Sequence, residues 1–370
     1  MRRPIDVIFL GPYPPPVNGQ SVAFKFAHDQ YNGTKKLCDQ NLEQLPFYKK
    51  IFFALKLIFT YIFLSTSRKY SVLYLAGSRS VGGALKDVFS ILFFHFTGSR
   101  IVLHIHAAFF NHFISSLPFY LKPLFTLAYH RVDRFIVLHE SMKGEYNGFL
   151  PEAQVSVLHN FYDPILDELE IKDKPNSEVI KIGYFSNLIY SKGIFILLEA
   201  FRELKKEYEH IELHIAGQYY SDQFMNERTV RERLNTFIKD PKDGIFYHGP
   251  LYGMQKKDFL KALDIFVLPS FYASEAMPIS IIEAMRSGCV IIATEHHYLP
   301  FLVGPDQGAC AKVRSVVSLK ENLTKYIEQR DLRDQVKRAN IEFAKKNYSP
   351  ENFASGINTI LELELKEFNV

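Results

Sequence analysis

Two glutamates stand eight positions apart in SEAMPISIIEAMRSG, the stretch from Ser274 to Gly288. Pro278 is typical of the first turn of a helix and Gly288 of the residue just after its end, so we expect a helix over about residues 278–287. Glu275 would then lie in the loop before this helix, and Glu283 inside it among apolar residues. A buried carboxylate needs hydrogen-bond partners, and two neighbouring ribose hydroxyls would provide them. The alternative is a structural carboxylate bonded to the backbone.

The start of this helix and a second loop offer groups for a phosphate. The free backbone amides of Met277, Ile279 and Ser280 would point toward an anion at the helix N-terminus, just after Pro278. Lys192, beside a glycine in SNLIYSKG, would pair with a diphosphate as a point charge. The alternative for Lys192 is a solvated side chain at a loop–helix junction.

A third candidate loop, GPYPPPVNGQS, follows the first apolar run of the chain. Its Asn18-Gly19 pair predicts a tight turn that tolerates positive φ, ahead of a helix that begins near Ser21. Because Gly19 has no Cβ, a phosphate or sugar can approach its backbone closely. The alternative is an ordinary strand-to-helix loop, since the stretch matches neither GxGxxG nor a P-loop.

Two histidine pairs complete the candidates. His104 and His106 lie at the end of a predicted strand. Because side chains alternate between the two faces of a sheet, both would lie on one face, and only His106 would reach the carboxyl end of the strand. A buried, hydrogen-bonded histidine is the alternative. No third ligand accompanies the pair at 296–297, so we predict no metal site.

The elements that must position these residues form two similar series. Short apolar β-branched runs alternate with amphipathic stretches, first at 6–11, 71–77, 100–106, 134–140 and 156–160, and again at 179–186, 211–217, 245–249, 264–270 and 289–294. Continuous apolar strands with intervening helices predict parallel sheets covered on both faces. A polar, proline-containing segment near residues 165–178 divides them. We therefore predict an α/β fold of two Rossmann-like domains, at residues 1–165 and 176–348, with ligands at the carboxyl ends of the strands.

Composition narrows the classes of protein. The chain has 370 residues, 47% hydrophobic and 23% charged, which is typical of a soluble globular protein. Three scattered cysteines predict a reducing compartment. The longest apolar run, residues 51–64, contains Lys56 and is shorter than the roughly 20 residues of a membrane span, so we expect a cytoplasmic protein. Through residue 165 there are 17 Lys and Arg against 10 Asp and Glu, which favours anionic partners for the first half.

Together these pieces closely resemble glycosyltransferase family 4, the retaining enzymes of GT-B fold, over nearly the whole chain. Glu275 and Glu283 match the E-x7-E pattern of that family and are followed by EAMRSGCVIIAT. The resemblance extends to Lys192-Gly193, the Asn18-Gly19 loop, His106 and Asn160. It implies two Rossmann-like domains that face each other across a cleft, with a last helix, residues 349–370, that crosses back onto the first domain.

The resemblance also implies roles for individual residues. Glu283 would bind the ribose of a nucleotide-sugar donor and Glu275 the hydroxyls of the transferred sugar. Lys192, with the amides at 277–280 and Gly19, would neutralise the diphosphate, and His106 would sit near the reacting sugar. Members of the family need no bound metal and no cofactor, so the nucleotide sugar, UDP- or GDP-linked, is a substrate.

Two departures from the family pattern concern the donor site. Asn187 stands where relatives commonly carry an arginine beside the phosphate lysine, so one expected cation is missing. The later motif GG-x-P-E is replaced by a run that begins at His297 and ends at Phe301. These changes bear on which donor sugar the protein accepts.

The first domain would meet the acceptor. Aromatic, basic stretches at 49–69 and 109–131 predict contact with the inner, anionic face of a membrane, although helices that cover a sheet are apolar anyway. Membrane contact favours a lipid-linked glycan acceptor, as in O-antigen, capsule or exopolysaccharide synthesis. The alternatives are a sugar-nucleotide epimerase or hydrolase of GT-B fold and an inactive binding protein. Nucleic-acid binding is not expected, because the basic residues form no aromatic-interleaved groove motif.

Overall fold

The computed structural model describes residues 5–40, 70–149, 151, 154–168 and 179–368. The chain divides into two compact units, unit 1 (Met1–His159 and Glu351–Val370) and unit 2 (Asn160–Pro350). Each contains a six-stranded sheet in which every described strand pair is parallel. The prediction of two Rossmann-like parallel-sheet domains is confirmed.

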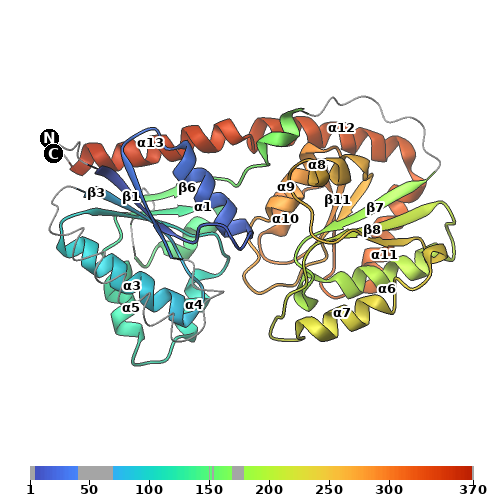
Figure 1. Cartoon of the computed structure of the whole chain (residues 1–370), viewed down its shortest axis with the longest axis horizontal. Coiled ribbons are helices and arrows are strands. Elements are labelled where there is room, and N and C mark those ends of the chain that lie inside the picture. The colour runs from blue at the N-terminus through green and yellow to red at the C-terminus, as the bar shows by residue number, and fades with distance from the viewer. Residues whose placement is uncertain (1–4, 41–69, 150, 152–153, 169–178, 369–370) are drawn as a thin grey trace. The chain divides into compact units, whose positions relative to one another are not determined.

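Unit 1 has the strand order β2-β1-β3-β4-β5-β6. The strands are β1 (Ile5–Gly11), β2 (Lys35–Asp39), β3 (Tyr70–Ala76), β4 (Arg100–His104), β5 (Arg134–Val137) and β6 (Val155–Val157). The helices are α1 (Gly19–Gln30), α3 (Val81–Phe96), α4 (Phe110–Ser116), α5 (Lys122–Tyr129) and α13 (Pro350–Phe368), with a 3-10 helix at Glu140–Tyr146. Within this unit, α1 and α13 cover one face of the sheet, and α3 and α5 cover the other (Figure 1).

The predicted strands of unit 1 all form, but several end earlier than predicted and one strand was not predicted. Those predicted over 134–140 and 156–160 end at Val137 and Val157. The central strand β1 has four consecutive residues, 7–10, with no exposed surface, as helices on both faces require. The strand predicted over 100–106 ends at His104, so His106 lies beyond the ladder. The edge strand β2 was not predicted, because its sequence KKLCD has only Cys38 buried and lacks an apolar run.

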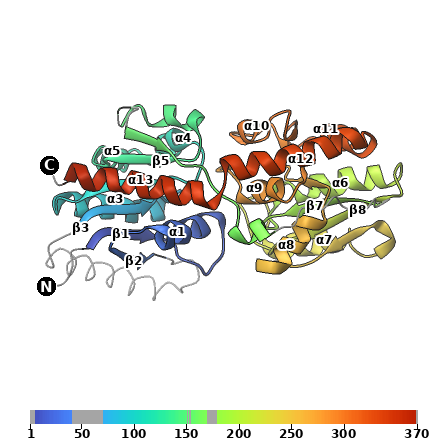
Figure 2. The ribbon, with the colours of Figure 1, turned by 90° about the horizontal axis from the view of Figure 1, so that it is seen from above.

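The last helix, α13, lies across the sheet of unit 1 (Figure 2). Its Glu364 has no exposed surface and accepts hydrogen bonds from the guanidinium Nε of Arg100, at 2.6 Å, and from that of Arg134. These arginines stand on the neighbouring strands β4 and β5. One buried carboxylate thus ties the helix to two strands, and residues far apart in the sequence form one unit.

Unit 2 has the strand order β12-β11-β10-β7-β8-β9. The strands are β7 (Ile180–Phe185), β8 (Ile211–Ala216), β9 (Ile245–Tyr247), β10 (Ile265–Val267), β11 (Val290–Thr294) and β12 (Gly308–Ala311). The helices are α6 (Ile194–Lys205), α7 (Glu227–Asn235), α8 (Gly253–Ala262), α9 (Ile279–Arg286), α10 (Leu299–Leu302), α11 (Val316–Glu328) and α12 (Arg330–Asn347), and 3-10 helices occur at Pro164–Glu168, Tyr190–Lys192 and Pro241–Asp243. Within the unit, α6 packs on α11, and α9 packs on α12 (Figure 1).

Some predicted segments are placed differently or lie outside the described residues. The sequence put the first domain up to residue 165, whereas residues 160–168 group with unit 2. The apolar run at 51–64, the stretch at 49–69 and the part of the linker at 169–178 lie outside the described residues. Among the helices that the structure describes, none has the length and apolarity to cross a membrane.

We predict that Glu364→Gln destabilises the protein by about 3 kcal/mol, because it removes the charge that two arginines share in a buried site. Glu367→Gln is the control: Glu367 also pairs with Arg100, at 2.6 Å, but its side chain is 48% exposed. Its loss should stay below about 1 kcal/mol. Urea unfolding of the two variants measures the difference, and equal losses would contradict the role assigned to Glu364.

Candidate functional site

The candidate site of unit 2 lies where its strand order reverses, between β7 and β10. Ligands of doubly wound sheets bind at such a point, outside the carboxyl ends of the strands. The loop after β7 carries Lys192, and the loop after β10 carries Glu275. Gly193 brings the two loops together: its φ is +79°, and a Cβ there would lie 2.0 Å from the carbonyl oxygen of Pro269. Only glycine combines this backbone with so close an approach.

Glu275 is 5% exposed and lies in a network of polar groups. Its Oε2 accepts hydrogen bonds from the hydroxyl of Ser270 and from the ammonium of Lys192, each at 2.6 Å. The carbonyl of Ser270 in turn accepts a hydrogen bond from the hydroxyl of Thr294 at the end of β11. The structure thus brings two predicted site residues, Lys192 and Glu275, into direct contact.

Two histidines support the loop that leads to Glu275. A ring nitrogen of His296 lies 2.9 Å from the carbonyl oxygen of Tyr272, and one of His297 lies 3.1 Å from that of Ala273. His297 has φ +53°, a left-handed backbone that favours glycine. The chain therefore keeps a glycine-like turn at this point, and the side chain that replaces glycine bonds to the neighbouring loop.

The helix after this loop, α9, is the predicted one, shorter by one residue at each end. Gly288 has φ +77°, and the amides of residues 288 and 289 bond back to the carbonyls of residues 285 and 284, which ends the helix as predicted. Pro278 at the N-cap offers no side-chain hydrogen bond. Ile279 and Ser280 are the first two residues of the helix, so their amides receive no hydrogen bond acceptor from an N-cap side chain.

Glu283 is 4% exposed and forms a charge cluster inside unit 2. Lys256 on α8 donates to its Oε1 at 2.7 Å and to Asp163 at 2.8 Å. Burial raises the pKa of Glu283, although the charge of Lys256 acts to lower it. Burial alone would lower the pKa of Lys256, but the two carboxylates raise it. Lys256 therefore provides the cation that opposes the effect of burial on Glu283.

The sequence analysis did not find Lys256, although a signal for it exists. Lys256 stands three and four positions before Phe259 and Leu260, on the face of α8 that the apolar pattern assigns to the interior. A lysine on such a face is unusual without a partner. Its partner, Glu283, is 27 positions further along the chain.

Residues 160–168 join unit 2 through polar contacts with the candidate site. The amide nitrogen of the Asn160 side chain donates to the carbonyl of Met277 at 2.7 Å. Asp167 accepts from the guanidinium of Arg286, the last residue of α9, at 3.1 Å, and Asp163 accepts from Lys256. Contacts just before α9, at its last residue and with Lys256 on α8 explain why this segment belongs to unit 2.

Asn187 lies two residues after β7. Its carbonyl oxygen accepts a hydrogen bond from the hydroxyl of Tyr184 at 3.2 Å. Because its side chain is uncharged, residue 187 does not bring to this edge of the sheet the positive charge that an arginine would.

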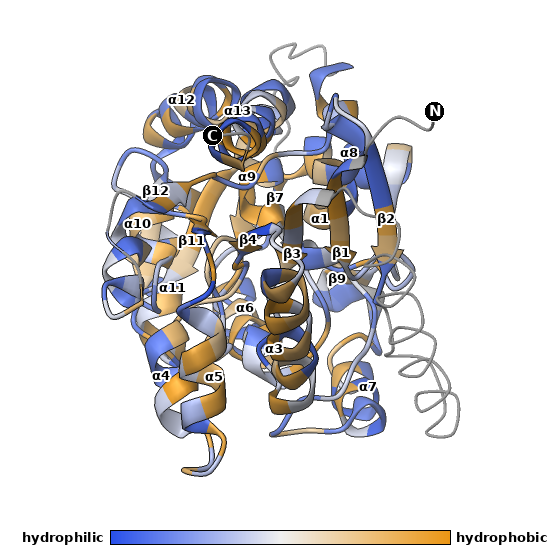
Figure 3. Cartoon of the chain, turned by 90° about the vertical axis from the view of Figure 1, so that its left-hand side faces the viewer, coloured by the Kyte–Doolittle hydropathy of each residue, from blue (hydrophilic) through white to orange (hydrophobic). Residues whose placement is uncertain are grey.

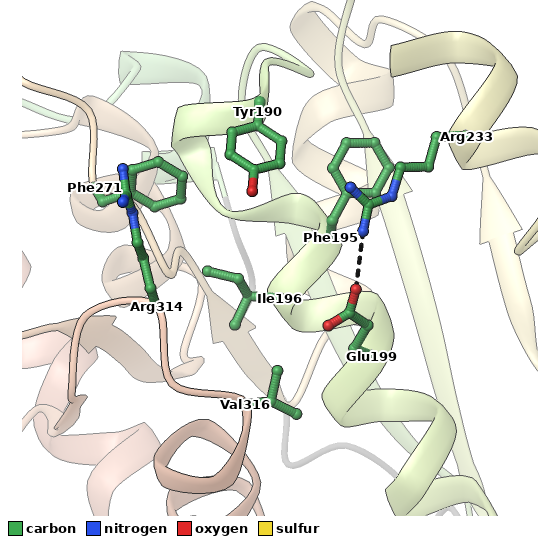
Figure 4. Close-up of a pocket in the computed structure, with 8 residues that line it drawn as sticks. All are labelled: Tyr190, Phe195, Ile196, Glu199, Arg233, Phe271, Arg314 and Val316. Atoms are coloured by element: carbon green, nitrogen blue, oxygen red, sulfur yellow. Dashed lines mark hydrogen bonds and ion pairs between the residues drawn. The ribbon is translucent and has the colours of Figure 1, made fainter. Parts of the chain in front are cut away.

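A pocket of about 170 Å³ opens beside the same loops (Figure 4). Tyr190 and Phe271, which line it, are close in the chain to Lys192 and Ser270. The guanidinium of Arg314 lies 4.3 Å from the ring centroid of Phe271. The other lining residues are Phe195, Ile196, Glu199, Arg233 and Val316, and Arg233 pairs with Glu199 at 2.9 Å. None of the predicted site residues lines this pocket.

In unit 1, the loop after β1 differs from its prediction. Gly19 is the first residue of α1 and does not have positive φ, and Asn18 caps the helix by accepting from the amide of Ser21 at 2.9 Å. The prediction of a tight turn was therefore wrong: the asparagine side chain caps a helix that begins at Gly19, two residues before the predicted start. A Cβ on Gly19 would meet nothing within 4 Å, so its backbone is open on that side.

The histidines of unit 1 stack at the end of β4. The ring centroids of His104 and His106 are 4.0 Å apart, and the hydroxyl of Tyr74 lies 2.6 Å from Nδ1 of His104. Both ring nitrogens of His106 are shielded from solvent and have no hydrogen-bond partner in the described structure. Burial lowers the pKa of His106 to about 4, so its imidazole is neutral at physiological pH.

Among the described residues, no group of three or more His, Cys, Asp or Glu side chains is arranged to hold a metal ion. Lys192, Glu275, Glu283 and the amides at 277–280 belong to unit 2, and Gly19 and His106 to unit 1. Within unit 2, Lys192 bonds to Glu275, whereas Glu283 bonds to Lys256 instead.

Part of the chain is similar in sequence to known proteins. Residues 167–343 match the model of the family described as Glycosyl transferases group 1. The chain is 29% identical over 143 residues to the putative teichuronic acid biosynthesis glycosyltransferase TuaC of Bacillus subtilis, covering 39% of this chain and 32% of that protein. It is 23% identical over 207 residues to the lipopolysaccharide 1,2-N-acetylglucosaminetransferase of Salmonella typhimurium, covering 53% and 49%. The chain thus spans about a third to a half of the length of these curated relatives.

A solved structure extends the similarity to the whole fold. Anabaena Alr3699/HepE in complex with UDP has a TM-score of 0.69 and 15% identity, and the match covers 98% of this chain and 100% of that one. At this identity the likeness shows the fold alone, which is the predicted GT-B type. Unit 2 is similar in sequence to group 1 glycosyltransferases over a segment that includes Lys192, Glu275 and Glu283.

We predict that Lys256→Met costs about 3 kcal/mol of stability at neutral pH, because Glu283 is left buried without its cation. The loss should shrink as the pH falls. Without Lys256 the pKa of Glu283 rises further, and a carboxyl whose pKa is higher in the folded state takes up a proton on folding. Lys261→Met, an exposed position on the same helix, is the control. A loss independent of pH in urea unfolding would contradict this account.

We also predict that protonation of His106 destabilises the fold in acid. Because its folded pKa, about 4, lies below the usual 6.5, the unfolded chain binds more protons, and stability falls as the pH drops from 6.5 toward 4. The contribution of His106 is at most about 3 kcal/mol. His106→Asn should flatten the dependence of stability on pH, whereas the exposed His112→Asn should leave it unchanged. Parallel profiles for the wild type and His106→Asn would show that His106 is not responsible.

Proposed function

We propose that the protein is a retaining, metal-independent hexosyltransferase of glycosyltransferase family 4. It would move a sugar from a UDP- or GDP-linked donor to a hydroxyl of a glycan acceptor. The observation that carries the proposal is the contact between Lys192 and Glu275 at the switch point of unit 2. Glu275 stands eight residues before Glu283, and all three residues lie inside the segment similar to group 1 glycosyltransferases. A cation beside a carboxylate suits a donor that has both an anionic diphosphate and neutral hydroxyls.

The groups of unit 2 divide the donor among them. An ammonium has three N–H bonds, so Lys192 can keep its bond to Glu275 and still donate to diphosphate oxygens. The amides at Met277–Ser280 would add neutral donors at the start of α9. Glu275 would accept from hydroxyls of the transferred sugar. Glu283 would accept from the ribose, since a carboxylate has about four lone-pair sites and Lys256 takes one of them.

Unit 1 would contribute to the same reaction through its strand-end loops. The open backbone at Gly19 suits close approach of a phosphate or sugar. His106, with a neutral ring whose nitrogens have no protein partner, would contact a sugar hydroxyl or the charge that develops at the reacting carbon. These assignments rest on the family resemblance and on the chemistry of each group.

The proposed reaction is a front-face substitution at the anomeric carbon. The bond from that carbon to the diphosphate oxygen breaks while a bond to the acceptor oxygen forms on the same face, which retains configuration. The proton of the acceptor hydroxyl passes to the departing phosphate oxygen. Lys192 and the helix amides stabilise the negative charge on the leaving group, so fixed protein groups serve where other enzymes use a metal ion.

The acceptor is proposed to be a lipid-linked glycan in surface polysaccharide synthesis, such as O-antigen, capsule or exopolysaccharide. The similarity to a putative teichuronic acid biosynthesis glycosyltransferase and to a lipopolysaccharide sugar transferase supports this class. The protein would then work in the cytoplasm, at the inner face of the membrane where such acceptors are assembled.

We predict different losses for the two glutamates. Glu283→Ala should weaken binding of the donor nucleotide by about 10- to 100-fold, since hydrogen bonds to a charged group are lost. Glu275→Ala should slow transfer more than it weakens nucleotide binding. Calorimetry with UDP and GDP, together with transfer rates from a panel of nucleotide sugars, separates the two effects. Full transferase activity in both variants would show that the site is elsewhere.

Two further arms of the assay test the reaction type. Activity should persist in EDTA, and a strict requirement for a divalent ion would contradict the proposed role of Lys192. Hydrolysis or epimerisation of the donor in the absence of any acceptor, with no transfer when acceptor is added, would favour the alternative enzymes. The control for both glutamate variants is Glu199→Ala, which removes the same charge from the neighbouring pocket and should leave transfer unchanged.

A further inference from the structure

Helix α3 of unit 1 is apolar on the side that faces away from its sheet. Val81, Phe89 and Phe96 are 42%, 63% and 85% exposed. Their spacing of eight and seven residues puts them on one face of the helix. Along the whole helix only Lys86 and Asp87 carry charge. A helix that is apolar all round is normally covered on all sides, whereas the described residues leave the outer side of α3 exposed.

The neighbouring helix continues this surface. Phe119 and Tyr120, in the loop before α5, are 84% and 67% exposed, and Leu127 on α5 is 49% exposed. The rings of Phe119 and Tyr120 pack edge to face with centroids 5.6 Å apart. Because α3 and α5 pack together on the same face of the sheet, their outward sides share one surface (Figures 1 and 3).

The charged side chains that α3 and α5 expose are cations, whereas Arg100 lies on β4 and is paired with Glu364 and Glu367. From residue 70 to residue 132 the only Asp or Glu is Asp87, which is 1% exposed. The same stretch holds five cations: Arg79, Lys86, Arg100, Lys122 and Arg131. Arg131, just after α5, is exposed, and Lys122, its first residue, is partly exposed. An apolar surface whose helices expose cations and no carboxylate matches an anionic lipid headgroup layer over a hydrocarbon interior.

We propose that Val81, Phe89, Phe96, Phe119, Tyr120 and Leu127, called here the α3–α5 surface, bind an anionic membrane. The aromatic rings enter the interface, and Lys122 and Arg131 contact phosphate oxygens. A second copy of this chain fits less well, because it would bring the same cations face to face without a carboxylate between them. The inference deepens the proposed function, since it gives the surface that brings unit 1 to a lipid-linked acceptor.

The chain contains no tryptophan, so single tryptophans report insertion directly. Phe96→Trp and Phe119→Trp should each show a blue shift of emission when vesicles of phosphatidylcholine with phosphatidylglycerol are added. Phe224→Trp, at a 48% exposed position of unit 2, should show none. A shift in all three variants, or in none, would overturn the assignment of the surface.

Vesicle sedimentation gives the strength of binding. The double variant Phe96→Ser/Phe119→Ser should bind at least about tenfold more weakly. The double variant Lys122→Ser/Arg131→Ser should bind about 30-fold more weakly to anionic vesicles and unchanged to pure phosphatidylcholine. Phe224→Ser/Val317→Ser, which removes two exposed apolar side chains of unit 2, should bind normally. Analytical ultracentrifugation without vesicles tests the rival: dimers that the first pair abolishes, with no vesicle binding, would overturn the proposal.

The two proposals fail separately in these measurements. Vesicle binding requires no nucleotide sugar, and donor binding requires no vesicle. Vesicle binding without any transferase activity would leave the membrane surface standing and remove the proposed enzyme. Transfer to a soluble glycan with no vesicle binding would support the proposed enzyme and remove the membrane surface.

Discussion

The approach of Gly193 to Pro269 governs the candidate site of unit 2. At this point the loop after β7 passes against the loop after β10 with no room for a Cβ. The contact is reinforced by the amide of Phe271, which donates to the carbonyl of Ser191 at 2.8 Å. Lys192 and Ser270 adjoin the crossing, and both bond to Glu275. A side chain at residue 193 would push the loops apart and remove the geometry that puts a cation beside a buried carboxylate.

Two buried glutamates, one in each unit, are compensated by partners from distant parts of the chain. Glu283 meets Lys256 from α8, and Glu364 meets arginines from two strands of unit 1. Without such a partner, burial of either carboxylate would cost a large part of the free energy of unfolding. Each of the two glutamates therefore requires a particular tertiary contact. In unit 2 these contacts also include Asp163, which explains why residues 160–168 pack with the candidate site.

The aromatic residues of unit 1 serve two separate purposes. Phe110, Phe135 and Tyr146 pack within 6 Å of one another inside the unit, where burial of their rings stabilises the fold. Those of the α3–α5 surface are also aromatic, but they are largely exposed in the part of the chain that the structure describes. Packing inside unit 1 therefore explains the first group of aromatic residues. The second group requires a binding partner outside the chain, which we propose to be a membrane.

The sequence by itself determined the two parallel sheets, the helix from 279 to 286 and its glycine stop, because hydrophobic period, proline and glycine act over short distances along the chain. It also singled out Lys192, Glu275 and Glu283 as candidate site residues. It missed β2, which has no apolar run, and it misjudged Asn18-Gly19, where a side-chain cap replaced a turn. Only the tertiary structure decided that Lys192 bonds to Glu275 and that Lys256 bonds to Glu283. Those residues are 83 and 27 positions apart, and such pairs are selected by packing and charge compensation in space, which no local pattern records.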